Sequence, residues 1–435
     1  MLWTTGTSAY QGLPLAMDPL ADWIRPENRP ADHRILVLIR LAAGITAQDL
    51  PDFPGSTETG PVFVFKGKPV THRRWQQALA VPRCYTGARG PWNRARYCTA
   101  LATPDFFQWL LAEPKVQALF DEITLCITPD VSEPPADDRE AGVAIDYSLP
   151  EAKVVTGVID YGLPLAIPLY SGIAPDGATV APPRLLSVWV QDGSPVRASA
   201  HNGLSRPTEF RYGAELSATA IRRIMRRAGG DEDRFYRMAA LFVPARLGTY
   251  WTQHTTTHGA HVLGNVVDPA ADAGHNPVIA VHLPSVAVED RTGASLSGHA
   301  VDAMRFIIAR TEDLSDPEDG RPMPPLVINL SYGFHAGPHD GNAPIEKAMT
   351  ELHALWSGVY PAAPFVIVVP AGNAYQSSTH ACWTASMLAS GDASVTWEIM
   401  PDDASCNILQ IWLPEGLAGG ATARLTSPQG QTVQL

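Results

Sequence analysis

A series of apolar, β-rich runs separated by helical periods constrains the fold of this 435-residue chain more than any other feature. Helical periodicity lies among these runs at about Gly298 to Ala309 and at Ile345 to Trp356. Apolar strands that alternate with helices predict a parallel sheet covered on both faces, with functional groups at the carboxyl ends of the strands. We therefore expect an α/β domain whose strands are VVTGVID, RLLSVWVQD, VIAVHLP, LVINLSYG and FVIVVPAGN.

A smaller unit is expected before this domain. His33–Leu41 and Ile123–Ile127 are β-rich runs, and another strand is expected at Tyr97–Thr103. After that strand, Thr103 can cap a helix, and Pro104 suits the first helical position because a missing N–H does no harm there. The pattern predicts a small α+β domain, and its helix packs through side chains at helical spacing, namely Phe107, Leu110, Leu111 and Val116.

Changes in composition and in apolar periodicity define the remaining segments. Residues 131–148 are acidic and contain prolines without apolar periodicity, which predicts an exposed linker. From residue 393 a two-residue alternation predicts a β-rich, sandwich-like segment, which reaches Leu435 without a closing turn, as though interrupted inside a strand. The expected organisation is a loosely ordered lead-in (1–31), the α+β domain (32–130), the linker (131–148), the α/β domain (149–392) with an inserted subdomain at about 175–250, and the β-rich segment (393–435).

Composition argues against several classes of partner. Lys plus Arg number 32 against 44 Asp plus Glu, so the net charge is −12 and no basic stretch offers a footprint for nucleic acid. The N-terminus lacks a basic head followed by an apolar run, and no apolar stretch approaches membrane-spanning length. We expect a soluble protein of the cytoplasm, with no membrane partner. Reduced thiols are expected because the cysteines are odd in number and lack CxxC spacing; they are Cys84, Cys98, Cys126, Cys382 and Cys406.

An aspartate and a histidine are candidates for proton transfer. Asp160 ends the run VVTGVID, a position that an ordinary turn aspartate also explains. His258 lies in THGAHVLG, where small residues indicate a helix N-terminus close to a sheet and a carboxylate can hold the imidazole. The alternatives are solvent-facing or core histidines, or a metal site formed by His254, His258 and His261. Gly259 and the preceding threonines disfavour a helix long enough for that metal site.

Two further strand ends carry polar or small residues. Asn373 ends FVIVVPAGN, where its amide can donate to a developing oxyanion and Gly372 allows close approach of the backbone. Ser331, Tyr332 and Gly333 end LVINLSYG and form a candidate substrate-binding edge. Taken alone, each position is better explained by a turn.

The motifs GVIDYG, THGAHVLG, VINLSYG and VVPAGN resemble, in kind and order, those of the subtilisin-like serine peptidases. The resemblance covers roughly residues 97–380, and the stretch 97–125 is similar to the second half of the family's inhibitory pro-region. It implies a subtilisin-like parallel sheet with helices on both faces. It also implies that Asp160 orients His258, that His258 is the general base and that Asn373 is the oxyanion donor, while the LSYG edge pairs with the substrate backbone.

The chain departs from the family pattern in three ways. Tyr161 replaces the usual Ser or Thr after the aspartate, and nearly a hundred residues separate Asp160 from His258. The family's Gly-Thr-Ser pattern for the nucleophile is not found. Ser386 in WTASMLAS departs from that pattern and follows the asparagine motif too closely. We expect the nucleophilic serine beyond Leu435, with the β-rich segment inserted before it.

These observations predict a serine endopeptidase that cleaves peptide or protein substrates through an acyl-enzyme. The segment 31–130 would be its own intramolecular chaperone and inhibitor. The alternative is a catalytically inactive binding or scaffold protein on the same fold. No cofactor is indicated: the acidic loop Asp316–Gly320 is of a kind that binds calcium, but a solvated turn is the preferred interpretation.

Overall fold

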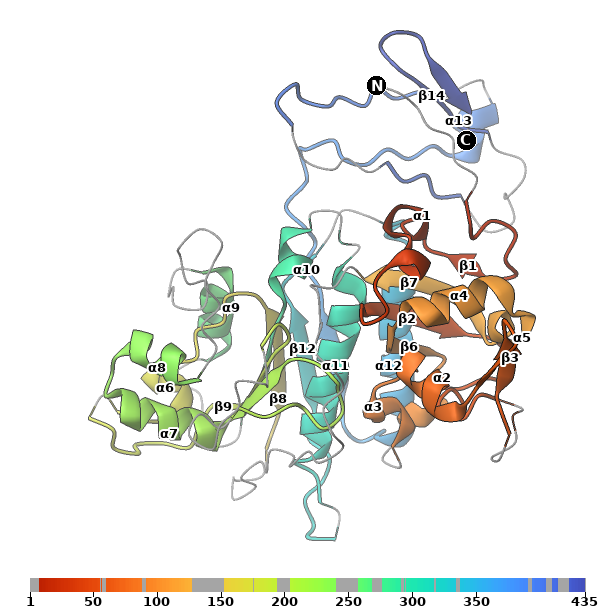
Figure 1. Ribbon diagram of the computed structural model, residues 1–435. Coiled ribbons are helices and arrows are strands. Elements are labelled where there is room, and N and C mark those ends of the chain that lie inside the picture. Colours follow the sequence, from red (N-terminus) through yellow and green to blue (C-terminus); the bar gives the residue numbers. More distant parts are fainter. Residues whose placement is uncertain are drawn as a thin grey trace.

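The computed structural model contains two main β-sheets, and helix α11 (Leu296–Glu312) lies between them (Figure 1). The structure describes residues 8–54, 56, 60–87, 91–126, 152–174, 176–193, 204–239, 257–267, 276–290, 293, 295–316, 318–333, 337–389, 393–403, 409–413 and 422–434. The predicted linker at 131–148 lies outside these residues.

The first sheet is built by the N-terminal part of the chain. Its strand order is β1-β7-β2-β6-β5, and every neighbouring pair is antiparallel except β1 with β7. The strands are β1 (Ala16–Met17), β2 (Ile35–Leu41), β5 (Leu79–Ala80), β6 (Tyr97–Ala102) and β7 (Phe120–Cys126). Part of the expected lead-in therefore belongs to this sheet through β1, which is ordered by pairing with β7.

Short helices and a hairpin cover this sheet. They are α1 (Ala21–Ile24), η1 (Pro26–Asn28), α2 (His72–Ala78), α3 (Arg83–Thr86), η2 (Pro91–Arg94), α4 (Pro104–Ala112), α5 (Pro114–Gln117) and the strands β3 (Phe63–Phe65) and β4 (Lys68–Val70). The expected order of strand, helix and strand over residues 97–126 is present.

Helix α4 confirms most of its prediction and corrects one detail. Pro104 is its first residue, and the expected apolar side chains pack inward, with Leu111 less buried than Phe107, Leu110 and Val116. Thr103 is the N-cap residue, but its side chain accepts no capping hydrogen bond. The predicted cap position is therefore confirmed, but the hydrogen bond there is made by the backbone: the N–H of Phe106 donates to the carbonyl of Thr103 at 3.0 Å.

The second sheet has the order β10-β9-β11-β8-β12-β13, and all neighbours are parallel except β10, which is antiparallel to β9. Alternate residues belong to two separate hydrophobic cores, with Val158 on one face and Ile159 on the other. Both faces of the central strands are therefore covered, which confirms the expected α/β class. The strands are β8 (Val155–Asp160), β9 (Leu185–Val190), β10 (Ala214–Ser217), β11 (Val278–His282), β12 (Leu326–Leu330) and β13 (Phe365–Val368).

Helices cover this sheet from two sides (Figure 1). The expected helices at 298–309 and 345–356 are α11 and α12 (Pro344–Val359). Strands β9 and β10 fall within 175–250, so this part of the expected insertion belongs to the main sheet itself. The other helices are α6 (Pro168–Ser171), α7 (Ala218–Ala228), α8 (Glu232–Ala239), α9 (His258–Val266), α10 (Ser285–Glu289) and α13 (Ala385–Ala389).

One face of the sheet is open at its β12–β13 end. Val366 of β13 pairs with Val327 of β12, which pairs with Thr156 of β8, while Val368 pairs with Asn329, which pairs with Val158. Paired residues point to the same face, so Val366 and Val368 share the face on which Val158 is buried. They are 48% and 45% exposed. The helices that bury this face over β8 therefore leave apolar side chains uncovered two strands away.

The C-terminal segment forms less β-structure than its alternation predicts. Strands β14 (Arg424–Thr426) and β15 (Thr432–Gln434) make an antiparallel hairpin. Residues 393–403 and 409–413 form no strand, and they expose large apolar side chains such as Trp397 and Trp412. Within the described residues the expected sandwich is not formed.

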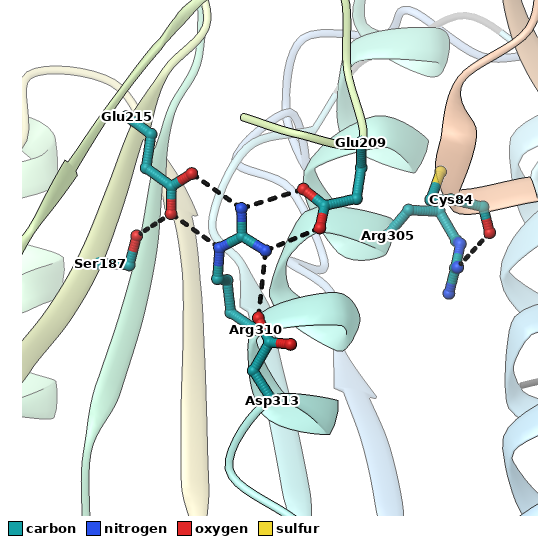
Figure 2. A network of polar contacts seen from close by, with 7 residues as sticks. All are labelled: Cys84, Ser187, Glu209, Glu215, Arg305, Arg310 and Asp313. Carbon is teal, nitrogen blue, oxygen red and sulfur yellow. Dashed lines mark hydrogen bonds and ion pairs between the residues drawn. The ribbon is translucent and has the colours of Figure 1, made fainter. Parts of the chain in front are cut away.

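Helix α11 carries charged side chains that are almost wholly buried. The guanidinium of Arg310 contacts Glu215 of β10 at 2.7 and 2.8 Å and Glu209 at 2.9 Å through two nitrogens, as Figure 2 shows. Glu215 also accepts the hydroxyl of Ser187 on β9, at 2.6 Å. On the side of the first sheet, Arg305 donates to the carbonyl of Cys84 and lies 3.9 Å above the ring of Trp92.

Two glycines let α11 approach both sheets closely. A Cβ at Gly157 of β8 would lie 2.7 Å from Ile307 of α11. A Cβ at Gly298 of α11 would lie 2.7 Å from the sulfur of Cys126 on β7. Helix and sheets therefore approach each other more closely than a side chain would allow.

Two sequence expectations concern the chain as a whole. No helix among the described residues is both long and apolar enough to cross a bilayer. The described cysteines Cys84, Cys98, Cys126 and Cys382 are free thiols, as expected, and Cys406 lies outside the described residues.

The contacts of Arg310 predict that the free energy of unfolding depends strongly on the pairing of this charge. Arg310→Met leaves the fully buried carboxylate of Glu215 without its cation, and we expect a loss of about 3–5 kcal/mol in the free energy of unfolding. The double variant Arg310→Met/Glu215→Leu removes both members of the fully buried pair and should regain part of that loss, while the carboxylate of Glu209, which is 20% exposed, loses its cation in both variants. Urea unfolding of the three proteins measures it. Equal destabilisation of the single and double variants would contradict the electrostatic explanation.

Asp302 of α11 predicts a pH dependence of stability. Burial raises its pKa from 3.8 to about 7, although Thr99 and Tyr212 donate hydrogen bonds to the carboxylate and oppose the rise. The folded protein keeps this proton where the unfolded chain has released it, so the free energy of unfolding should fall as pH rises from about 4 to about 7.

Asp302→Asn should remove up to about 1.4 kcal/mol per pH unit from the slope in that window. Urea unfolding at several pH values measures the slope. Asp105→Asn, at a half-exposed surface pair with Arg74, is the matched control and should leave the slope unchanged. An Asp302→Asn slope equal to that of the parent protein would show that another group controls the pH dependence.

Candidate active site

The carboxylate of Asp160 and the imidazole of His258 meet at the carboxyl end of β8. His258 Nδ1 lies 2.9 Å from Asp160 Oδ1. The Asp160 side chain is fully buried, whereas the His258 side chain is 63% exposed. The pair that the sequence motifs suggested is thus hydrogen-bonded, with the carboxylate enclosed and the imidazole accessible.

Local sequence explains why His258 begins helix α9 at this point. Thr257 is the N-cap, and its hydroxyl accepts the N–H of Ala260 at 3.3 Å. The N–H of Gly259 donates to the carbonyl of Tyr161 at 3.0 Å, and a Cβ at Gly259 would lie only 2.4 Å from that oxygen. Only glycine allows the helix end to lie this close to the turn after β8.

The hydrogen bonds of Asp160 fix the position of a proton. Burial raises the pKa of Asp160 above its usual value, but hydrogen bonds from His258 and from the N–H of Tyr161, at 2.6 Å, oppose the rise. An ionised carboxylate can only accept, so with Asp160 ionised Nδ1 of His258 carries the proton of this hydrogen bond and a neutral imidazole keeps its lone pair on Nε2. Asp160 Oδ2 has no hydrogen-bond partner in the described part of the chain.

Sequence reasoning missed His282. It ends β11 directly opposite Asp160 in the parallel register, and its Nε2 accepts the N–H of Gly162 at 3.1 Å. The available signal was the same as for Asp160, because His282 is a polar residue that ends an apolar strand run. Sequence alone does not give the register that brings the two strand ends together.

The candidate substrate edge follows β12. The N–H of Ser331 donates to the carbonyl of Ile159 at 3.3 Å, which joins this segment to β8 just before Asp160. Tyr332 donates its hydroxyl to the carbonyl of Val288, and Gly333 is exposed. These residues therefore lie at the same sheet edge as the Asp160–His258 pair.

Asn373 and Gly372 follow β13, two strands from β8. Both are exposed, and no hydrogen bond joins Asn373 to the Asp160–His258 pair within the described residues. Gly372 has a φ of +85° with nothing within 4 Å of a Cβ placed there. The backbone conformation favours glycine here, and the close approach of a substrate that the sequence suggested stays a prediction.

Other candidates lie apart from this pair. Ser386 is exposed in the short helix α13, where its hydroxyl lies 2.9 Å from that of Thr384. His261 is an exposed residue of α9, and His254 lies outside the described residues. No group of His, Cys, Asp and Glu side chains suited to a metal ion occurs in the described ranges. In the acidic loop, Arg321 Nη2 lies 3.5 Å from Asp316 Oδ2 and 3.6 Å from Asp319 Oδ2, so both carboxylates form ion pairs with this arginine.

Comparisons with models of protein families, with curated proteins and with solved structures find no match to this chain.

Proposed function

We propose that this chain carries the Asp–His part of a subtilisin-like serine endopeptidase site. The observation that supports it is the 2.9 Å hydrogen bond between the buried Asp160 and the exposed His258 at the carboxyl edge of a parallel sheet. This is the edge at which α/β proteins hold their reacting groups.

The geometry of the pair fits general-base catalysis. Nε2 of His258 takes the proton of a serine hydroxyl as that oxygen attacks the peptide carbonyl, and then gives the proton to the leaving amine. Water hydrolyses the resulting acyl-enzyme by the same proton route. Asp160 holds the Nδ1–H tautomer and stabilises the imidazolium that forms. In this proposal the amide of Asn373 donates to the oxyanion, and residues 331–333 pair with the substrate backbone.

The N-terminal unit is proposed to be the inhibitory pro-region. Its contacts with the α/β domain include a helix-to-backbone contact: Glu351 of α12 accepts the N–H groups of Arg96 and Tyr97 at 2.9 and 2.8 Å. Glu312 of α11 accepts the indole N–H of Trp92 at 2.7 Å. One continuous hydrophobic core spans both units, so the N-terminal unit is docked and not merely tethered.

The nucleophile is the missing part of the proposal. The open face of β12 and β13 lies on the side of the sheet that α9 covers over β8. An element that buried Val366 and Val368 would therefore lie next to the helix of His258, and we propose that the serine is carried there.

The second candidate function is a catalytically inactive binding protein on the same fold. The observation in its favour is that no serine among the described residues is hydrogen-bonded to His258. The two candidates differ in whether the complete gene product contains a serine that His258 activates.

Fluorophosphonate labelling of the complete gene product tests the proposal. The parent protein should be labelled on one serine, and His258→Ala should abolish labelling because the base is lost. Asp160→Asn should slow peptide hydrolysis by about 10⁴-fold, since the wrong tautomer is then held.

His261→Ala is the matched control, because this exposed histidine lies in the same helix and should leave labelling unchanged. Equal loss in both histidine variants would contradict the assigned role of His258. A gene product with no labelled serine would overturn the enzyme proposal in favour of the binding protein.

A further inference from the structure

His282 is buried beside the Asp160–His258 pair without touching the solvent-exposed imidazole. It ends β11, pairs with Asp160 in the parallel register, and is 3% exposed. The N–H of the next residue, Leu283, donates to the carbonyl of Asp160 at 2.8 Å. The backbone of β11 therefore fixes Asp160, and the side chain of His282 is left free to act on the turn that follows.

A single hydrogen bond to the ring defines the tautomer of His282, since Nδ1 is buried with no hydrogen-bond partner in the described part of the chain. Nε2 accepts the N–H of Gly162 at 3.1 Å, so this nitrogen carries a lone pair and Nδ1 carries the proton. Nδ1 lies 4.0 Å from Asp192 Oδ1, while Asp192 Oδ2 accepts the N–H of Ser285. Burial lowers the pKa of His282, although the nearby carboxylates of Asp192 and Asp160 act in the opposite direction.

The turn that His282 holds connects both members of the pair. At its start, the N–H of Tyr161 donates to Asp160 Oδ1 at 2.6 Å. At its end, the carbonyl of Tyr161 accepts the N–H of Gly259, and the carbonyl of Gly162 accepts the hydroxyl of Thr257. One short turn thus orders the carboxylate and also the helix end that bears the imidazole.

Gly162 is the residue on which this arrangement depends. Its φ is +72°, which favours glycine, and a Cβ there would lie 2.7 Å from Thr257. Gly162 is buried, and a buried N–H without an acceptor is costly. His282 supplies the acceptor, and its ring also packs 4.9 Å from the ring of Tyr161.

We propose that His282, neutral and protonated on Nδ1, is a positioning residue that holds the turn between Asp160 and His258. The catalytic meaning of this role rests on the proposed peptidase function, but the geometry does not. If Nε2 of His282 took up a proton, its N–H would face the N–H of Gly162, and two donors would meet with no acceptor between them. The groups that face His282 and set this equilibrium are Asp160 after β8, Asp192 after β9 and the ring of Tyr161 in the turn.

Hydrogen exchange by NMR on the 435-residue chain, labelled with ¹⁵N-glycine and ¹⁵N-histidine, tests the proposal. His282→Leu removes the acceptor, and the N–H groups of Gly162 and Gly259 should exchange at least about tenfold faster. His282→Gln keeps an acceptor near the position of Nε2 and should restore most of the protection. The Nδ1–H resonance of His258, which reports its bond to Asp160, should be lost in the leucine variant and retained in the glutamine variant.

His299→Leu is the matched control, since His299 is also buried and neither of its ring nitrogens has a partner in the described part of the chain. This variant should leave the exchange rates of the Gly162 and Gly259 N–H groups unchanged. If His282→Leu leaves Gly259 unchanged, or if His282→Gln behaves like His282→Leu, the positioning role is wrong.

A titration of the unmodified chain covers the case in which His282→Leu does not fold. The protection factor of Gly162 should fall as the ring of His282 takes up a proton, followed by its ¹⁵N shifts. Constant protection through that titration would overturn the proposal. None of these measurements needs a nucleophile, so the role of His282 and the peptidase function can fail separately.

Discussion

Helix α11 lies between two sheets, and the rest of the structure depends on satisfying the charges that it carries there. Arg310 reaches Glu215 and Glu209 on the side of the parallel sheet, and Arg305 reaches the carbonyl of Cys84 on the side of the N-terminal sheet (Figure 2). Arg305 also lies over the ring of Trp92. A charged group left unpaired in such a position would cost several kcal/mol. Two carboxylates pair with Arg310, whereas Arg305 has a carbonyl and a ring face, and its Nε and Nη1 have no hydrogen-bond partner among the described residues. The helix therefore sets how the two units face each other, and the N-terminal unit completes the core of the α/β domain.

The same helix also fixes the strand that bears the candidate site. Ile307 packs against Gly157 in the middle of β8, three residues before Asp160. Backbone pairing with β11 and β12 then fixes the rest of β8 up to its carboxyl end. There the N–H of Leu283 donates to the carbonyl of Asp160, and the N–H of Ser331 donates to the carbonyl of Ile159. Asp160 is consequently held by its own main chain before any side-chain contact is considered. His258 is held less directly, through the end of α9 and the turn at 161–162, so its geometry is the more easily altered of the two.

Elements with a strong local pattern were predictable from the sequence, and contacts that depend on register were not. The strands VVTGVID and LVINLSYG and the helices α11 and α12 are present near their expected positions, because long apolar periods leave few alternatives. Strand β1 is two residues long, too short to give a pattern, and its pairing with β7 needs a partner more than a hundred residues away. The two-residue alternation from residue 393 predicts strands, but a strand also needs a neighbour to share its hydrogen bonds, and residues 393–403 have none in the described structure. The resemblance in the kind and order of the motifs predicts the Asp160–His258 pair, whereas His282 requires knowledge of which strands lie side by side.

The ionisation of Asp160 links the fold around β8 to the proton position on His258. Its carboxylate is enclosed, and burial favours the neutral form. Two hydrogen bonds oppose that tendency, from Nδ1 of His258 and from the N–H of Tyr161, and both end on the same oxygen, Oδ1. A neutral carboxyl could offer its own proton to His258 and so leave Nδ1 without one, and the imidazole would then no longer present Nε2 as a base. The turn that presents the N–H of Tyr161 therefore does more than place a side chain: it favours the ionised form of Asp160, and so also the tautomer in which Nε2 of His258 keeps its lone pair.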